Sequence, residues 1–177
     1  RVRDAGVDDG VFPIHADARS LPFGPDFFDA IVCIDAFPYF GTDDLYLNYL
    51  AHFVKVGGAI GVAGASVVQD IEGPLPEHLA AWWSQDCWAF HSASWWRRHW
   101  ERTGIVAVEH ADTMPDGWQV WLDWHKAVAP DNATEIAALE ADGGRYLGYV
   151  RLVGRRRDDV KLEEYCWPDP LRSLPPE

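Results

Sequence analysis

The strongest constraint on the fold is a nearly unbroken apolar run at residues 27–34, which ends at Asp35. Its Ile and Val residues are typical of a strand that is buried on both faces. A second, shorter run, Val11 to His15, also opens into polar residues, beginning at Asp17. Ligands of open α/β sheets bind just beyond the carboxyl ends of the strands. We therefore expect Asp17 and Asp35 to lie together on that rim.

Downstream of Asp35 the chain alternates between helical and strand-like segments, as in an α/β fold. Thr42 is expected to cap a helix that continues to about Val54 and ends at Gly57 and Gly58. Ser92 is expected to cap a later helix. The expected strands are Phe28–Ile34, Ala59–Ala65, Ile105–His110 and Tyr146–Val153, and the other expected helices are Glu77–Trp83, Trp95–Thr103, Trp118–His125 and Ala133–Ala141.

A family resemblance rests on the string Asp-Ala-x-x-Leu-Pro-Phe at residues 17–23 and Phe-Asp-x-Ile-Val at residues 28–32. Together these resemble the class I S-adenosylmethionine-dependent methyltransferases, most closely the ubiquinone/menaquinone-biosynthesis-type and small-molecule branch. The resemblance covers about residues 11–111 and includes the helix–Gly-Gly–strand pattern. It implies a Rossmann-like α/β sandwich, S-adenosyl-L-methionine as cofactor, and methyl transfer to a small-molecule acceptor.

Two parts of the family pattern have no counterpart in the chain. These are the glycine-rich loop after the first strand and the ribose-binding acidic residue after the second strand. We therefore expect residues 1–157 to be the carboxyl-terminal part of a methyltransferase domain whose amino-terminal third is missing. The expected sandwich is incomplete, without its first two strands, and carries a helical Trp-rich cover. Residues 158–177, which are polar and Pro-rich, are expected to form a loosely ordered tail.

The resemblance assigns cofactor contacts residue by residue. It implies that the Asp17 carboxylate accepts a hydrogen bond from the adenine amino group, and that the backbone at Ala18 meets an adenine ring nitrogen. It places Asp35, Ala36 and Phe37 beside the methionine part of the cofactor. The simpler alternatives are that Asp17 only forms a turn and that Phe37 packs in the core.

The reaction chamber is expected beyond the strand that ends at Asp35. Asp35 and Tyr39 are the candidate catalytic residues, and His91 and His110 are further possible bases. A base is needed only if the acceptor must lose a proton. The sequence does not choose among these four side chains, and a lone His is more often structural.

The chain contains 10 Trp, and six of them lie between residues 82 and 100. Because the family places its acceptor after the fifth strand, Trp82, Trp83 and Trp88 are candidate acceptor-binding residues together with Tyr39. Aromatic faces attract cations and also bind flat or apolar acceptors. The alternative is that these rings form the aromatic core of a helical cover.

Charge and motifs exclude other function classes. The net charge of −13 disfavours DNA or RNA as a partner, and the sequence has no long apolar run that predicts a membrane partner. The three Cys and seven His show no metal-ligand spacing, so no metal is expected, and a cytoplasmic location is the default. The alternative function is a non-catalytic methyltransferase-like domain that binds a ligand or partner. A nicotinamide-dependent oxidoreductase is disfavoured by the string at residues 17–23.

Overall fold

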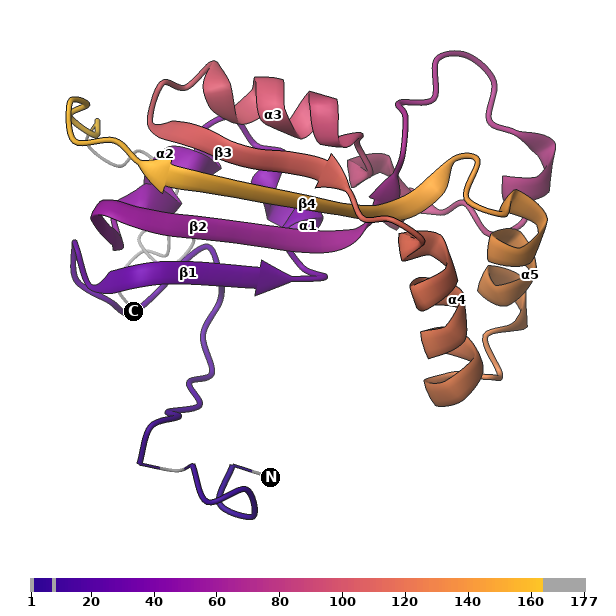
Figure 1. Cartoon of the computed structure of the whole chain (residues 1–177), viewed down its shortest axis with the longest axis horizontal. Helices are drawn as coiled ribbons and strands as arrows, with labels where there is room; N and C mark the ends of the chain where they lie inside the picture. Colours follow the sequence, from indigo (N-terminus) through magenta and orange to yellow (C-terminus); the bar gives the residue numbers. More distant parts are fainter. Residues whose placement is uncertain (1, 8, 164–177) are drawn as a thin grey trace, which may run out of the picture.

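A four-stranded mixed sheet forms the centre of the protein, for which a computed structural model describes residues 2–7 and 9–163 (Figure 1). The strand order is β1-β2-β4-β3, and only the β1–β2 pair is parallel. This confirms the expected α/β class. The expected tail lies outside the described residues from residue 164 onward. The strands are β1 (Phe28–Ile34), β2 (Val54–Val67), β3 (Val106–Thr113) and β4 (Leu147–Arg156).

The long strand β2 differs from the prediction because it begins at Val54 and continues through the glycine pair. Its register against β1 shifts between Phe28 and Ala30, which pair with Val54 and Ala59. A bulge of this kind needs small residues, and a Cβ at Gly58 would lie 2.7 Å from the carbonyl oxygen of Asp29. The glycines that were expected to end a helix therefore bend a strand instead.

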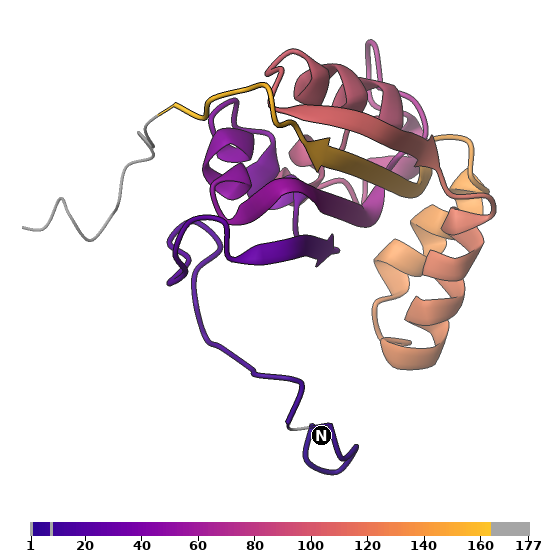
Figure 2. The ribbon, with the colours of Figure 1, turned by 60° about the vertical axis from the view of Figure 1, so that its left-hand side comes forward.

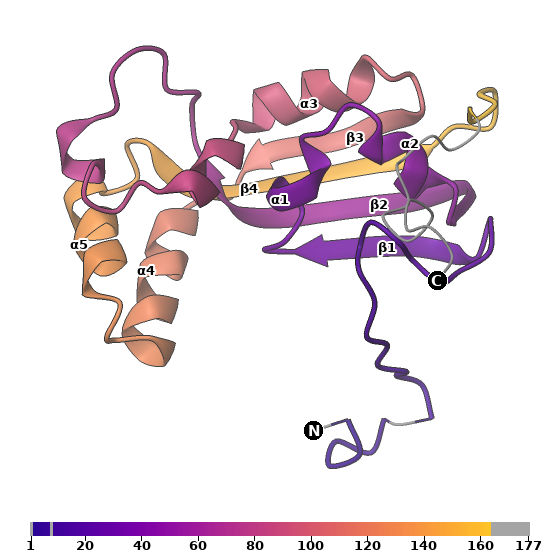
Figure 3. The same cartoon turned by 180° about the vertical axis from the view of Figure 1, so that it is seen from behind.

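One face of the sheet is covered by three helices and holds the main core. These are α1 (Pro38–Gly41), α2 (Tyr46–Ala51) and α3 (Ala93–Glu101), and Figure 3 shows α1 and α2 lying in front of β2. The core is aromatic, with the Phe37 and Trp100 ring centroids 5.7 Å apart. The prediction of one helix capped by Thr42 was wrong, because Thr42 ends α1 and the chain turns before α2 begins. The Ser92 cap was predicted correctly: its hydroxyl accepts a hydrogen bond from the Trp95 backbone N–H.

A second, smaller core lies beyond the carboxyl end of β1. There α4 (Gly117–Val128) and α5 (Ala133–Asp142) run side by side (Figures 1 and 3). Two 3-10 turns, η1 (Glu77–Leu79) and η2 (Gln85–Ala89), complete this part in place of the helix expected at 77–83. No helix among the described residues is long and apolar enough to cross a membrane.

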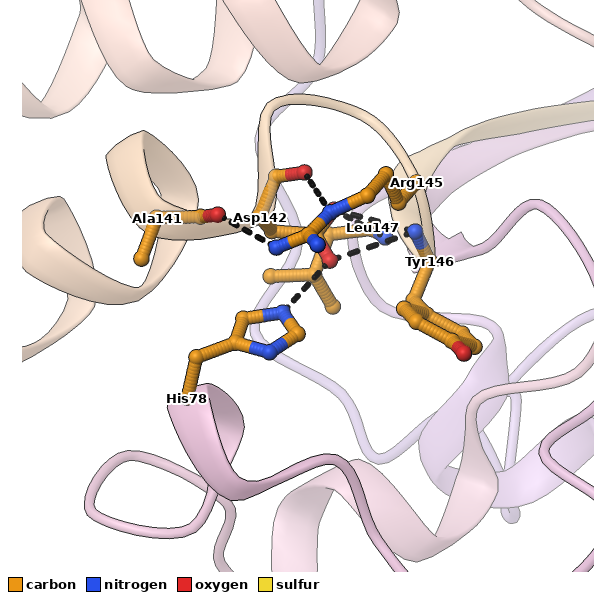
Figure 4. Close-up of polar contacts among 6 residues, drawn as sticks. All are labelled: His78, Ala141, Asp142, Arg145, Tyr146 and Leu147. Atoms are coloured by element: carbon orange, nitrogen blue, oxygen red, sulfur yellow. Dashed lines mark hydrogen bonds and ion pairs between the residues drawn. The ribbon is translucent and has the colours of Figure 1, made fainter.

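The Asp142 carboxylate joins three of these elements (Figure 4). It is fully buried, and its Oδ2 accepts hydrogen bonds from the backbone N–H groups of Tyr146 at 3.0 Å and Leu147 at 2.9 Å. Its Oδ1 lies 2.9 Å from His78 Nε2. One side chain therefore fixes the end of α5, the start of β4 and η1 relative to one another.

The strand expected at Val11–His15 is absent. These residues run away from the sheet and make no strand pairing within the described part of the chain (Figures 1 and 2). The side chain of Phe12 is 74% exposed, so burial does not stabilise this segment either. A short apolar run forms a strand only where a neighbouring strand satisfies its backbone groups, and Pro13 removes one donor.

Candidate functional site

A cavity of about 480 Å³ lies between the carboxyl end of β1 and the α4–α5 pair. This volume suits a small organic ligand. Strands β1, β2 and β4, helices α1, α4 and α5, and the segment around η2 all contribute to its wall. The lining residues are Asp35, Pro38, Tyr39, Ala65, Trp82, Ser84, Asp86, Cys87, Phe90, Met114, Val120, Trp121, Trp124, His125, Glu135 and Tyr149.

Asp35 occupies the rim where β1 ends. Its backbone is left-handed, with φ of 57°, which turns the chain sharply toward α1. Its Oδ1 accepts a hydrogen bond of 2.5 Å from the Tyr149 hydroxyl and one of 3.3 Å from the Ala65 backbone N–H. Burial and the Asp35 carboxylate both raise the pKa of Tyr149, which therefore stays a protonated donor. Three strands thus hold this carboxylate at the cavity.

A second polar group lies on the helical wall. Glu135 Oε1 accepts a hydrogen bond of 2.9 Å from Trp121 Nε1 and lies 2.9 Å from His125 Nε2. Asn132 holds the other oxygen of Glu135 at 2.7 Å. Nδ1 of His125 is buried and has no hydrogen-bond partner among the described residues.

Three carboxylates line the cavity: Asp35, Asp86 and Glu135. Burial, and then the charges of Asp86, Cys87, Asp35 and Glu135, raise the pKa of the Tyr39 hydroxyl. The pKa of Cys87 is also raised, mainly by burial, so its thiol is neutral at physiological pH and a weak nucleophile. None of the described residues that line the cavity is a Lys or an Arg.

The cavity brings together Asp35, Tyr39 and Trp82 from the residues predicted by sequence. Trp83 lies beside this group but packs edge-on against Trp82, at 6.1 Å between ring centroids, within the second core. Trp88 is 72% exposed and does not line the cavity. Of the three candidate acceptor-binding tryptophans, the geometry therefore favours Trp82.

The residues predicted to bind adenine lie outside this cavity. Arg19 Nε and Nη2 donate to the two Asp17 oxygens at 3.0 and 2.8 Å. These hydrogen bonds from Arg19 lower the pKa of Asp17 to about 2. The carbonyl of Ala18 accepts a hydrogen bond of 2.9 Å from the Tyr46 hydroxyl, which anchors this loop to α2. The adenine contact at Asp17 and Ala18 stays a prediction.

The other candidates also lie elsewhere. Phe37 is 1% exposed and packs in the aromatic core, while Ala36 precedes it in the turn that follows Asp35. His91 stacks on Trp95 at 3.8 Å, and His110 Nε2 lies 3.0 Å from Asp112 Oδ1. Neither His lines the cavity.

The sequence did not indicate most of the α4 and α5 residues that line the cavity, nor the β4 residue that does so. Trp121 and His125 were recognised only as residues at helical spacing, and Tyr149 only as part of a strand. The available signal was the spacing of Trp121, Trp124 and His125, which places three large side chains within one turn of α4. No sequence pattern indicated Glu135 as a site residue, because its position at the cavity depends on how α5 packs against α4.

Comparison with known proteins identifies the fold. The chain aligns over 88% of its length with geranyl diphosphate C-methyltransferase from Streptomyces coelicolor A3(2), with TM-score 0.66 and 17% identity. It aligns similarly with the cyclase SpnF, over 88% with TM-score 0.63 and 17% identity. Phosphoethanolamine N-methyltransferase 2 from Haemonchus contortus aligns over 80%, with TM-score 0.62 and 13% identity.

The alignments span only part of these proteins, covering 57%, 60% and 36% of the three chains respectively. No family model and no curated protein matches the sequence. A cyclase stands among the similar structures, so the fold alone does not define the reaction. The chain has the Rossmann-like α/β fold of the S-adenosylmethionine-dependent methyltransferases.

Proposed function

We propose that this protein transfers a methyl group from S-adenosyl-L-methionine to a small molecule bound in the cavity. The observation that carries the proposal is Asp35, held at the carboxyl end of a parallel strand and facing an aromatic cavity of about 480 Å³. This is where α/β sheets bind ligands. Structures of similar fold have been determined with S-adenosylmethionine or S-adenosylhomocysteine bound.

The residues at the rim fit the sulfonium end of this cofactor. A sulfonium carries a positive charge, and the Asp35 carboxylate and the Tyr39 ring are both attractive to a cation. When bound, the cofactor supplies an electrophilic methyl group. Asp35 would hold the charged end, and Tyr149 would keep the Asp35 carboxylate in place through its hydrogen bond.

The cavity itself would contribute orientation and exclusion of water. Trp82, Phe90 and Trp121 form an apolar wall that holds an acceptor in a fixed position, which can supply several kcal/mol to such a reaction. Asp35 or Asp86, which line the cavity, would accept a proton where the acceptor must lose one. Glu135 holds the His125 ring in the wall, and Nδ1 of that ring is buried. Tyr39 and Tyr149 are poorer bases, because their raised pKa values keep both phenols protonated.

Asp35→Asn tests the proposal directly. We expect cofactor affinity in a calorimetric titration to fall by about tenfold to a hundredfold, since a charge-assisted contact is worth about 1.5–3 kcal/mol. Asp29→Asn is the matched control, because Asp29 lies on the same strand but pairs with Lys55 away from the cavity. Absence of cofactor binding by the unmodified protein, or equal affinity of both variants, would contradict the proposal.

Asp17→Ala tests the adenine contact separately. If the Asp17 carboxylate meets the adenine amino group, cofactor affinity should fall several-fold while the melting temperature without cofactor changes little, because Asp17 is exposed. Arg19→Ala is the control for the ion pair, since it frees Asp17 without removing it. Unchanged affinity in both variants would reduce the role of Asp17 to forming the turn.

A further inference from the structure

We infer that the acceptor is a small, positively charged amine, an inference that rests on the methyltransferase function proposed above. The site consists of three carboxylates and a group of aromatic rings that line the same cavity. The carboxylates are Asp35, Asp86 and Glu135, and the rings are Tyr39, Trp82, Phe90, Trp121 and Trp124.

None of the three carboxylates is paired with a Lys or an Arg among the described residues, although Glu135 lies 2.9 Å from His125 Nε2. Asp35 accepts hydrogen bonds from a phenol and a backbone N–H, and Glu135 is bound by an indole, an imidazole and an amide. Asp86 has no ion-pair partner among the described residues. Elsewhere on the protein, carboxylates such as Glu109 and Asp112 are paired with arginine. Negative charge left unneutralised around a cavity stabilises a cationic ligand there.

The charges act on one region of the cavity. The Tyr39 hydroxyl is influenced by Asp35, Asp86 and Glu135, which come from β1, η2 and α5. These three elements are far apart in the sequence, so their convergence depends on the tertiary fold. A ligand near Tyr39 would therefore lie in the combined field of Asp86 and Glu135, while Asp35 would face the cofactor's charged end.

The aromatic rings provide the second half of a cation site. Trp82, Phe90 and Trp121 form a closed triangle, with centroid separations of 5.7 Å for Trp82–Trp121 and 6.3 Å for both pairs that include Phe90. Trp124 and Tyr39 are 54% and 60% exposed and so lie at the mouth. Ring faces combined with carboxylates bind alkylammonium groups, because the ring quadrupole and the charges both attract a cation.

This composition disfavours the other acceptor classes. An anionic acceptor, such as a phosphate ester, would be repelled by three carboxylates. A purely apolar acceptor would remove water from those carboxylates without replacing its hydrogen bonds, which is costly. A protonated amine avoids both penalties. To become nucleophilic it must break one N–H bond and keep the electron pair, and a carboxylate that lines the cavity, Asp35 or Asp86, is available to take the proton.

Choline and its neutral isostere 3,3-dimethylbutan-1-ol are suitable probes, because they differ in charge but hardly in shape. Binding is followed by tryptophan fluorescence and calorimetry, with and without saturating S-adenosylhomocysteine, which carries no sulfonium charge. We expect choline to bind at least about tenfold more tightly than the isostere, in line with a desolvated cation–π contact. Asp86→Asn and Trp82→Leu should each reduce this preference several-fold.

Two control variants distinguish an effect at the cavity from the general effect of removing a charge or an aromatic ring from the surface. Asp123→Asn removes the same charge from an exposed position on α4, and Trp88→Leu removes an exposed ring on η2. Neither residue lines the cavity, and neither change should alter the preference. Equal affinity for choline and the isostere overturns the inference, as does loss of choline binding when S-adenosylhomocysteine is present. In the second case the cation site would belong to the cofactor.

Failure of the inference is distinguishable from failure of the proposed function. Methyl transfer without any preference for choline would support the proposed function and contradict the inference that the acceptor is an amine. Choline binding that depends on Asp86 and Trp82, in a protein that binds no cofactor, would support the cation site and contradict the proposed methyltransferase function.

Discussion

Trp100→Ala is expected to lower the free energy of unfolding by about 3–5 kcal/mol, the range for removing a large buried aromatic side chain. Trp100 is 0% exposed, and its ring lies at the centre of the aromatic core beside Phe37. The packing extends to β4, because a Cβ at Gly154 would come within 2.9 Å of the ring. The missing side chain would leave a cavity that the surrounding strands cannot fill. Urea denaturation followed by far-ultraviolet circular dichroism measures the change.

Trp88→Ala is the matched control for this substitution. Its side chain is 72% exposed, so the free energy of unfolding should change by less than about 0.5 kcal/mol. A loss below about 1 kcal/mol for Trp100→Ala would show that the core does not depend on this ring.

Asp142→Ala is expected to destabilise the protein by roughly 2–5 kcal/mol. The carboxylate accepts hydrogen bonds from two backbone N–H groups and faces His78 in a buried position. Each N–H left without a partner costs about 1–3 kcal/mol. The change should appear in the urea midpoint at constant slope, since the folded and unfolded states keep their compactness.

Asp142→Asn is the informative comparison, because the carboxamide oxygen still accepts from the backbone while the charge is removed. We expect it to lose less than half as much stability as Asp142→Ala. Equal losses in the two variants would mean that the charge, and hence the contact with His78, dominates over the backbone hydrogen bonds.

The elements that were predicted correctly depend on local signals. The run from Phe28 to Ile34 forms a strand that ends at Asp35, and Ser92 caps α3 through its own hydroxyl. The expected burial of that strand on both faces was wrong, because β1 is at one end of the strand order among the described residues, with Val32 71% and Ile34 56% exposed. The strand and the helix cap each depend on residues that are close together in the sequence. Val11–His15 has the same kind of apolar sequence, but a strand requires a partner that the segment itself cannot encode.

The glycine pair at residues 57–58 illustrates a second limit of local reasoning. Glycine can end a helix or bend a strand, because both use backbone conformations that other residues avoid. Which one forms depends on pairing with β1, where a side chain at Gly58 would collide with the Asp29 carbonyl. The same sequence signal therefore has two structural outcomes, and tertiary contacts decide between them.

The candidate site was predictable on the strand side and not on the helix side. Asp35 and Tyr39 follow directly from the end of β1, whose position is fixed by sequence. Trp121, His125 and Glu135 lie on α4 and α5, where periodicity indicates a buried face but not whether that face meets a core or a cavity. The orientation of the helix pair relative to the sheet is a property of packing alone.

The position of β4 has a consequence for how the protein is made. This strand is the last one among the described residues, yet it lies between β2 and β3, and its register joins Ala59 to Arg155 and Val106 to Arg156. During translation β2 and β3 leave the ribosome well before the strand that joins them. A nascent chain that stalls before Leu147 therefore holds two open strand edges, which promote association with other chains. Early-terminated products of this gene should be substrates for chaperones and proteases, and no shortened folded form should accumulate.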